Sequence, residues 1–178
     1  VDITQRKEAE EVLRESEERF RNIVDSSLMG VFLYEMERDG QLILVGANPA
    51  ADEILGVKTS DFIGMALEEA FPPLADTEIP HHYREAAAAG IPWHSRQVDY
   101  EHGDIQGAYE VTAFQTAPNQ VAVMFLDITE RMKAEEAVRA SEERLRLATQ
   151  VGRVGTWEYH LDSDELKWDS LMYELYGI

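Results

Sequence analysis

Apolar residues recur at alternating spacings of four and three in two charged segments of the chain, residues 3–24 and residues 131–150. This heptad spacing is typical of helices that pair along one narrow apolar seam. An isolated helix of about 20 residues is marginal in water, so each segment is predicted to be a helix that pairs with a partner helix. The large apolar side chains of the seam are Leu13, Phe20, Ile23, Val138 and Leu145.

The two charged segments are near copies of one another. Residues 2–21 read DITQRKEAEEVLRESEERFR, and residues 127–146 read DITERMKAEEAVRASEERLR. At the same offset, GTWEYHL at residues 155–161 follows the register of GVFLYEM at residues 30–36. Self-similarity at a fixed offset indicates a repeating unit. The predicted segments are a linker helix (1–24), a complete domain (25–130), a second linker helix (131–150) and the start of a second domain (151–178).

Short β-prone runs fall into two groups separated by helical segments. The predicted strands are residues 30–34, 42–45, 93–100, 105–115 and 120–128. Residues 58–90 between the two groups have the pattern of several short helices. Strands segregated from helices in this way indicate an α+β fold with one antiparallel sheet and the helices on one side. The last strand contains VAVMFL, whose consecutive apolar residues predict cover on both faces.

A short helix after the second predicted strand carries both start and stop signals. Asn48 can cap its N-terminus, Pro49 suits its first position and Gly56 follows its end. We therefore interpret Asn48 as a helix cap rather than as a ligand contact.

The charge of the chain argues against several partners. Its 35 acidic and 16 basic residues give a formal net charge of −19 at pH 7, which repels phosphate backbones and anionic lipid headgroups. The sequence also has no apolar run of about 18 residues and no signal-peptide pattern. We expect a cytoplasmic location, with no nucleic-acid partner and no direct membrane contact.

No residue pattern in the chain indicates catalysis. The absence of cysteine removes disulfides, thiolate metal ligands and cysteine nucleophiles. There is no glycine-rich phosphate loop, no Ser and His pair at catalytic spacing and no kinase-type phospho-acceptor helix. The segment is therefore predicted to be non-catalytic and to have no metal site.

Two motifs, NPAADEILG after the second predicted strand and DITER at the end of the last, resemble the PAS sensory-box family. Members of this family are sensor modules of bacterial and archaeal histidine kinases, diguanylate cyclases and related signalling proteins. The resemblance covers residues 16–131 in full and residues 141–178 as the start of a second copy. It implies a five-stranded antiparallel sheet around a small internal pocket, with flanking coiled-coil-type helices.

The resemblance also implies that Asp127, Ile128 and Thr129 form an exit from the sheet into an output helix, with Arg131 following closely. In physical terms, the side chain of Asp127 or Thr129 can accept hydrogen bonds from the first free amides of that helix. A rearranged last strand would therefore shift or loosen the helix.

No residue pattern in the sequence singles out a ligand for the implied pocket. In heme-binding members of the family the histidine that binds heme lies on the long helix. When Tyr83 and Gly90 are matched to the family pattern, Pro80 stands at that position and His81 and His82 are displaced from it, which argues against heme. The missing cysteine excludes a cysteine-adduct flavin, whereas a non-covalent small molecule stays open. The candidate pocket residues are Tyr83, Trp93, Tyr109, Phe114 and Met124.

Two functions fit the sequence. The first is a sensor that detects a small molecule and passes the change through the exit to a coiled coil, within a longer protein such as a sensor histidine kinase of a two-component system. The second is a ligand-free spacer that forms a homodimer through its flanking helices and relays signals between neighbouring PAS and output domains. A cyclic-dinucleotide enzyme is the alternative parent protein.

Overall fold

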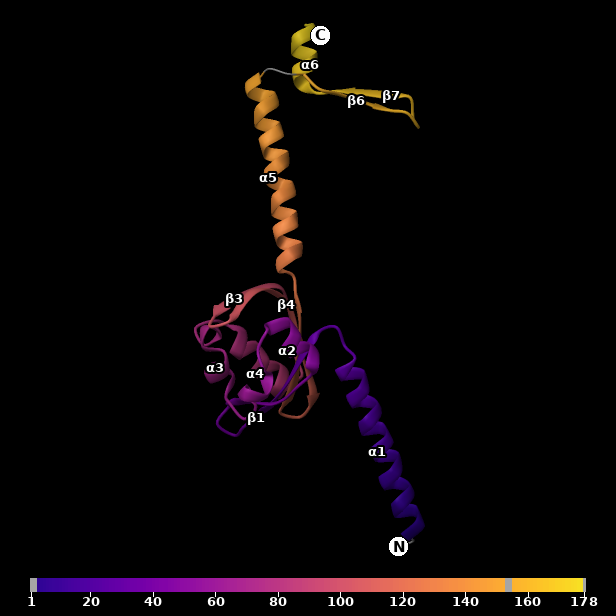
Figure 1. The fold of residues 1–178 in the computed structure, drawn as a ribbon, viewed down its shortest axis with the longest axis vertical. Coiled ribbons are helices and arrows are strands. Elements are labelled where there is room, and N and C mark those ends of the chain that lie inside the picture. Colours follow the sequence, from indigo (N-terminus) through magenta and orange to yellow (C-terminus); the bar gives the residue numbers. More distant parts are fainter. Residues whose placement is uncertain (1–2, 153–154, 178) are drawn as a thin grey trace. The chain divides into compact units, whose positions relative to one another are not determined.

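The computed structural model describes residues 3–152 and 155–177, which form two compact units (Figure 1). The first unit extends to Thr129 and the second begins at Glu130. Each unit is described by itself.

The first unit is built on a five-stranded sheet in which every neighbouring pair is antiparallel. The strands are β1 Gly30–Met36, β2 Leu42–Ala47, β3 Trp93–His102, β4 Ile105–Ala117 and β5 Gln120–Asp127. Their order across the sheet is β2-β1-β5-β4-β3, so the last strand in the sequence lies in the middle. This arrangement confirms the predicted α+β fold with one antiparallel sheet.

Short helices pack against one face of the sheet and close the core (Figure 1). They are α2 Pro49–Leu55, the 3-10 helix η1 Thr59–Phe62, α3 Leu67–Ala70, the 3-10 helix η2 Pro72–Leu74 and α4 Ile79–Ala89. Leu67 of α3 and Ala86 of α4 are almost completely buried against the strands. Gly90 ends α4 with a φ of 67°, a left-handed conformation that favours glycine.

The central strand β5 is covered on both faces over only part of its length. Val121, Ala122 and Val123 are all 3% exposed or less, as the run of apolar residues predicts. Leu126, near the end of the strand, is 37% exposed. The double cover therefore ends before the strand reaches the exit.

Long helices flank the sheet in sequence. Helix α1 spans Ile3–Asp25 and helix α5 spans Thr129–Gly152. All five large seam residues, two of them on α5, are between 58% and 65% exposed. Their apolar surface is therefore left open to solvent within the described chain.

Asn48 joins the end of α1, the start of β1 and the start of α2. Its Oδ1 accepts hydrogen bonds from the backbone N–H groups of Ala51, at 3.1 Å, and of Val31, at 2.8 Å. Its Nδ2 donates to the carbonyl oxygens of Val24 and Met29, both at 2.9 Å. The side chain is 2% exposed, so these four bonds form away from water. Asn48 is a helix cap, as expected, and also a link between three elements.

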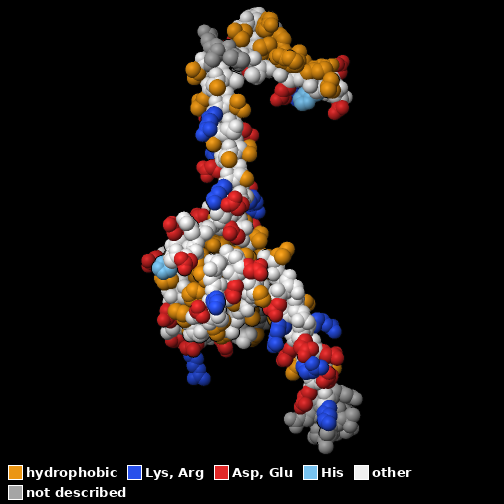
Figure 2. All heavy atoms as spheres, in the orientation of Figure 1, with side chains coloured by type: hydrophobic (Ala, Val, Ile, Leu, Met, Phe, Trp, Pro, Cys, Tyr) orange, Lys and Arg blue, Asp and Glu red, His pale blue; other side chains and the backbone are white. Residues whose placement is uncertain are grey.

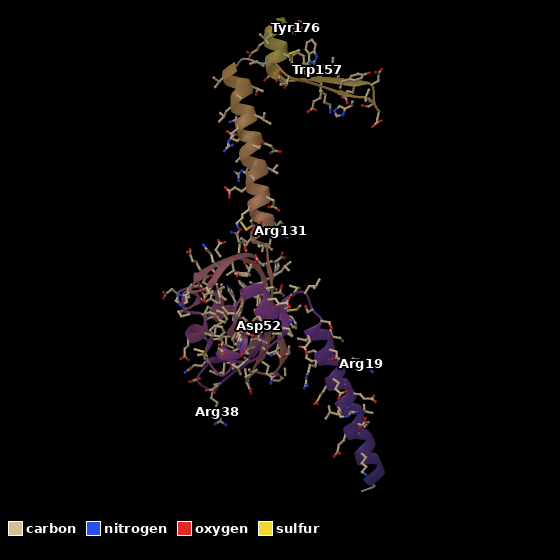
Figure 3. All side chains as sticks on the ribbon, in the orientation of Figure 1. Arg19, Arg38, Asp52, Arg131, Trp157 and Tyr176 are labelled. Atoms are coloured by element: carbon tan, nitrogen blue, oxygen red, sulfur yellow. The ribbon has the colours of Figure 1, made fainter. Side chains whose placement is uncertain are left out.

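The second unit contains a hairpin and a short helix after α5. These elements are β6 Trp157–His160, β7 Glu165–Trp168 and α6 Ser170–Tyr176. Hydrophobic side chains gather over them in Figure 2, and Trp157 and Tyr176, labelled in Figure 3, are both more than half exposed.

Asp169 has the same place in this second unit as Asn48 has in the first. Its Oδ1 accepts from the backbone N–H of Met172 at 2.9 Å, and its Oδ2 accepts from that of Thr156 at 2.8 Å. Thr156 stands at the register position of Val31, directly after a glycine. The repeated sequence therefore builds a repeated hydrogen-bonding pattern.

Replacing Asn48 with alanine removes four buried hydrogen bonds at once. We expect the free energy of unfolding to fall by about 2–4 kcal/mol, because a helix cap and several buried backbone groups lose their partner. Urea denaturation measures this change. Asn22→Ala, at an exposed position of α1, is the control and should change the free energy by less than about 0.5 kcal/mol. Equal stability of the two variants would contradict the linking role of Asn48.

Candidate functional site

The core of the first unit contains a partly open cavity of about 70 Å³ between the sheet and the short helices. Its wall consists only of aromatic and aliphatic residues from β1, β3, β4, β5, α2, α4 and the segment around η2. Four of them are tyrosines: Tyr34, Tyr83, Tyr100 and Tyr109. The cavity is therefore an apolar space, and four of the residues that line it carry a hydroxyl group.

Burial raises the pKa of all four tyrosine hydroxyls. The pKa of Tyr100 rises to about 12, and those of Tyr34 and Tyr83 also lie well above the usual value, in each case chiefly because burial disfavours the phenolate. For Tyr109, the negative charge of Asp127 adds to the effect of burial on the pKa. These hydroxyls are therefore neutral hydrogen-bond donors at physiological pH.

The Tyr100 hydroxyl differs from the other polar groups of the core. Among the residues that the structure describes, it is the one buried side-chain polar atom without a hydrogen-bond partner. Buried polar groups are nearly always paired, so an unpaired one at a cavity wall needs an explanation.

The candidate pocket residues do not all reach this cavity. Tyr83 and Tyr109 line it, whereas Trp93 packs against the Tyr83 ring with 5.8 Å between ring centroids and is not part of the wall. Phe114 and Met124 project from the other face of the sheet. Successive strand residues point to opposite faces, and their neighbours Ala113 and Val123 are the ones buried in the core.

The alternation of residues along β3 could not have identified Tyr100. A register shift between Ser95 and Val98 interrupts the pairing of β3 with β4. Because of this irregularity, Val98 and Tyr100 line the cavity although an unbroken alternation from Trp93 would turn them outward.

Two residues of the exit from the sheet, Ile128 and Thr129, form hydrogen bonds with Ala108 on β4. The backbone N–H of Ile128 donates to the Ala108 carbonyl at 2.8 Å, and the N–H of Ala108 donates to Thr129 Oγ1 at 3.0 Å. The backbone N–H of Thr129, at the start of α5, donates to Asp127 Oδ1 at 2.8 Å. Of the two expected capping residues, Asp127 therefore accepts from the helix start, while Thr129 binds the neighbouring strand.

Gly107 brings the cavity wall and the exit close together. A Cβ atom at this position would lie 2.8 Å from Thr129 Oγ1 and 3.0 Å from the Tyr109 hydroxyl oxygen. Both hydroxyls therefore border the space that the missing side chain leaves. Tyr109 lines the cavity with its ring and ends beside the exit, so one side chain connects the two features.

Arg131 follows in the first turn of α5 and is labelled in Figure 3. Its Nε lies 3.9 Å from Glu135 Oε1, and both side chains are more than half exposed. Ion pairs of this kind contribute little to stability, so the pair gives no evidence for a role in the exit.

The two histidines of α4 lie outside the cavity. His81 lies 3.6 Å from the Glu85 carboxylate, and the His82 ring stacks on Trp93 with 5.2 Å between centroids. Pro80, by contrast, is buried. Among the described residues, no group of three or more histidines and acidic side chains is placed to hold a metal ion.

Comparison with known proteins identifies the family. The model of the PAS fold matches residues 24–133, which is more than half of the chain. The chain belongs to the PAS-fold family. Its first unit is a PAS sensory domain, whose sheet, cavity and exit are those described above. No helix in the described residues is long and apolar enough to span a membrane.

This PAS chain is similar to one curated protein and to several solved structures. A probable diguanylate cyclase, DgcE of Escherichia coli K12, is 26% identical over 93% of the chain, which spans only 15% of that protein. A domain of a sensory box sensor histidine kinase/response regulator from Geobacter sulfurreducens is 18% identical, with a TM-score of 0.51 over 65% of this chain and 96% of that one. A LOV protein from Rhodobacter sphaeroides is 15% identical, with a TM-score of 0.55 over 72% of this chain and 76% of that one. The two structures share the fold with this chain.

Replacing Gly107 with alanine tests the close contact at the exit. The new methyl group would collide with Thr129 Oγ1 and the Tyr109 hydroxyl, so we expect a loss of about 1–3 kcal/mol in the free energy of unfolding. Gly46→Ala is a matched control on β2, because its Cβ would meet Leu33 at 3.4 Å, an ordinary contact. Chemical denaturation compares the two variants. If Gly107→Ala were as stable as Gly46→Ala, the exit would not be closely packed.

Proposed function

We propose that this chain is a sensory module of a signal-transduction protein, which detects a small molecule in its cavity and passes the change through Asp127, Ile128 and Thr129 to α5. The observation that carries the proposal is the contact at Gly107, where Tyr109 of the cavity wall and Thr129 of the exit border the same space. A molecule that displaces the Tyr109 ring would move its hydroxyl in the space that Thr129 Oγ1 also borders.

The exit is suited to a change between two arrangements. Thr129 either keeps its hydrogen bond to Ala108, which holds the start of α5 against β4, or loses it and frees the helix. Shifting such an equilibrium from 1:99 to 99:1 takes about 5.5 kcal/mol of differential binding. A few contacts that differ between the two states, together with a buried apolar surface, are of this order.

The parent protein has two candidates. The relative with 26% identity is a probable diguanylate cyclase, which supports a cyclic-dinucleotide enzyme. The likeness to a histidine kinase domain is one of fold and supports a sensor histidine kinase less directly. In both cases the PAS domain supplies the signal and another domain supplies the catalysis.

Thr129 variants test the transmission step. Native mass spectrometry of the protein purified under gentle conditions first shows whether a molecule is bound. Hydrogen exchange of the first turns of α5 is then compared with and without that molecule. We expect a difference in the wild type and in Thr129→Ser, which keeps the oxygen, and no difference in Thr129→Val, which cannot accept from Ala108. A protein that never carries a molecule, or a response that persists in Thr129→Val, would contradict the proposal.

A second candidate function is relay by a ligand-free homodimer. The observation that favours it is the exposure of the seam: Leu13 and Leu145 are 59% and 65% exposed on helices with heptad spacing. A second copy could cover this seam, and the small residues between the large ones keep such a coiled coil weak and easily shifted.

Leucine substitutions on and beside the seam test the dimer. We expect light scattering to show a dimer for the wild type. For Leu145→Asn, which places a polar group in the seam, the dissociation constant of the dimer should rise at least about tenfold. Leu147→Asn is the matched control, because Leu147 is exposed on the same helix but lies off the heptad positions. A monomeric wild type, or equal effects of both substitutions, would rule out pairing along this seam.

A further inference from the structure

We propose that the cavity takes a small, neutral, mostly apolar molecule with one oxygen atom, and that the Tyr100 hydroxyl donates a hydrogen bond to that oxygen. The inference rests on the proposed sensory function and names the chemistry of its ligand.

The Tyr100 hydroxyl is the starting point. The residue is 7% exposed, it lines the cavity, and its hydroxyl has no hydrogen-bond partner among the described residues. A buried donor without an acceptor is costly, because it has lost its water and gained nothing in return. A carbonyl or alcohol oxygen in the cavity would supply the missing acceptor. Burial also raises the pKa of Tyr100 to about 12, so the hydroxyl keeps its proton for this bond.

The rest of the wall decides the charge of the ligand. Apart from the tyrosine hydroxyls, every lining residue is phenylalanine, leucine, isoleucine or valine. An ion in such a space would be buried without a counter-charge, at a large cost in solvation. Glu68, the carboxylate that acts on the pKa of Tyr34, is itself paired with the Arg84 guanidinium. The ligand is therefore neither a carboxylate, a phosphate nor an amine.

The volume decides its size. The cavity of about 70 Å³ is roughly half of an engineered cavity, about 150 Å³, that holds benzene. About three to five non-hydrogen atoms correspond to this volume. Short ketones, aldehydes and alcohols have this size, and heme and flavin do not.

Two compounds of the same shape isolate the hydrogen bond. Butanone carries a carbonyl oxygen, and 2-methyl-1-butene has a methylene group in its place. We expect NMR titration of the full chain to show saturable binding of butanone at the core residues, with an affinity up to about tenfold above that of the alkene. In Tyr100→Phe this preference should disappear, while binding of the alkene continues. Tyr83→Phe is the matched control, a cavity-lining tyrosine that should keep the preference.

The stability of the unliganded variant gives an independent reading. Since the Tyr100 hydroxyl has no partner among the described residues, Tyr100→Phe should leave the melting temperature unchanged or raise it. A clear fall would mean that the hydroxyl is already satisfied inside the protein, which overturns the inference. Failure of both compounds to bind, or an oxygen preference that survives in Tyr100→Phe, overturns it as well.

These outcomes differ from those that would end the sensory proposal. If butanone does not bind but the purified protein carries another molecule and α5 responds to it through Thr129, the sensory function stands and the assigned ligand chemistry is wrong. If butanone binds through Tyr100 and hydrogen exchange of α5 does not change, the ligand chemistry stands and the transmission is wrong.

Discussion

The insertion of β5 between β1 and β4 is the constraint on which the domain depends. This strand is the last of the sheet in sequence, yet it pairs with both neighbours along its length, from Gly30–Glu35 on one side to Tyr109–Ala117 on the other. The sheet is therefore complete only when its final strand is in place, because the pairing of β5 with β1 joins the last strand of the sheet to the first. The same strand forms part of the cavity wall and continues directly into α5. In the proposed function, a ligand and the output helix would therefore both act on β5.

Close packing on β4 explains how a small ligand could have a large effect. Three consecutive residues of β4 contribute differently. Gly107 has no side chain to fill the space beside the exit, Ala108 forms a hydrogen bond with Thr129, and Tyr109 lines the cavity. Protein interiors are packed too tightly to absorb a displaced ring by compression, so a shift of Tyr109 is passed to the atoms that it touches. Thr129 is one of the residues beside that space. In the proposed mechanism, such a shift would keep or break the hydrogen bond from Ala108 to Thr129, which is a change between two discrete states.

Local patterns predicted the elements, whereas the cavity depended on features that a sequence does not display. The Asn48 cap and the helix end at Gly56 follow from the conformations that these residue types favour, and the structure has both. Tyr100 was missed because the irregularity in β3 changes which face its residues take. Phe114 and Met124 were chosen by residue type, but strand alternation directs them to the outer face. The hydrogen bond from Ala108 to Thr129 could likewise not be predicted, because the tertiary fold brings these two residues together.

The two copies of the repeated pattern show why an asparagine, and not an aspartate, suits the first joint. Asn48 and Asp169 use their side-chain oxygens alike, each accepting from the start of its own helix and from the residue after a glycine. Only the amide of Asn48 can also donate, and it does so to the end of α1 and to Met29. An ionised carboxylate has no hydrogen to give, so Asp169 cannot hold the preceding chain in this manner. The first domain therefore binds the end of α1 to the sheet through Asn48 and the start of α5 to the sheet through Thr129.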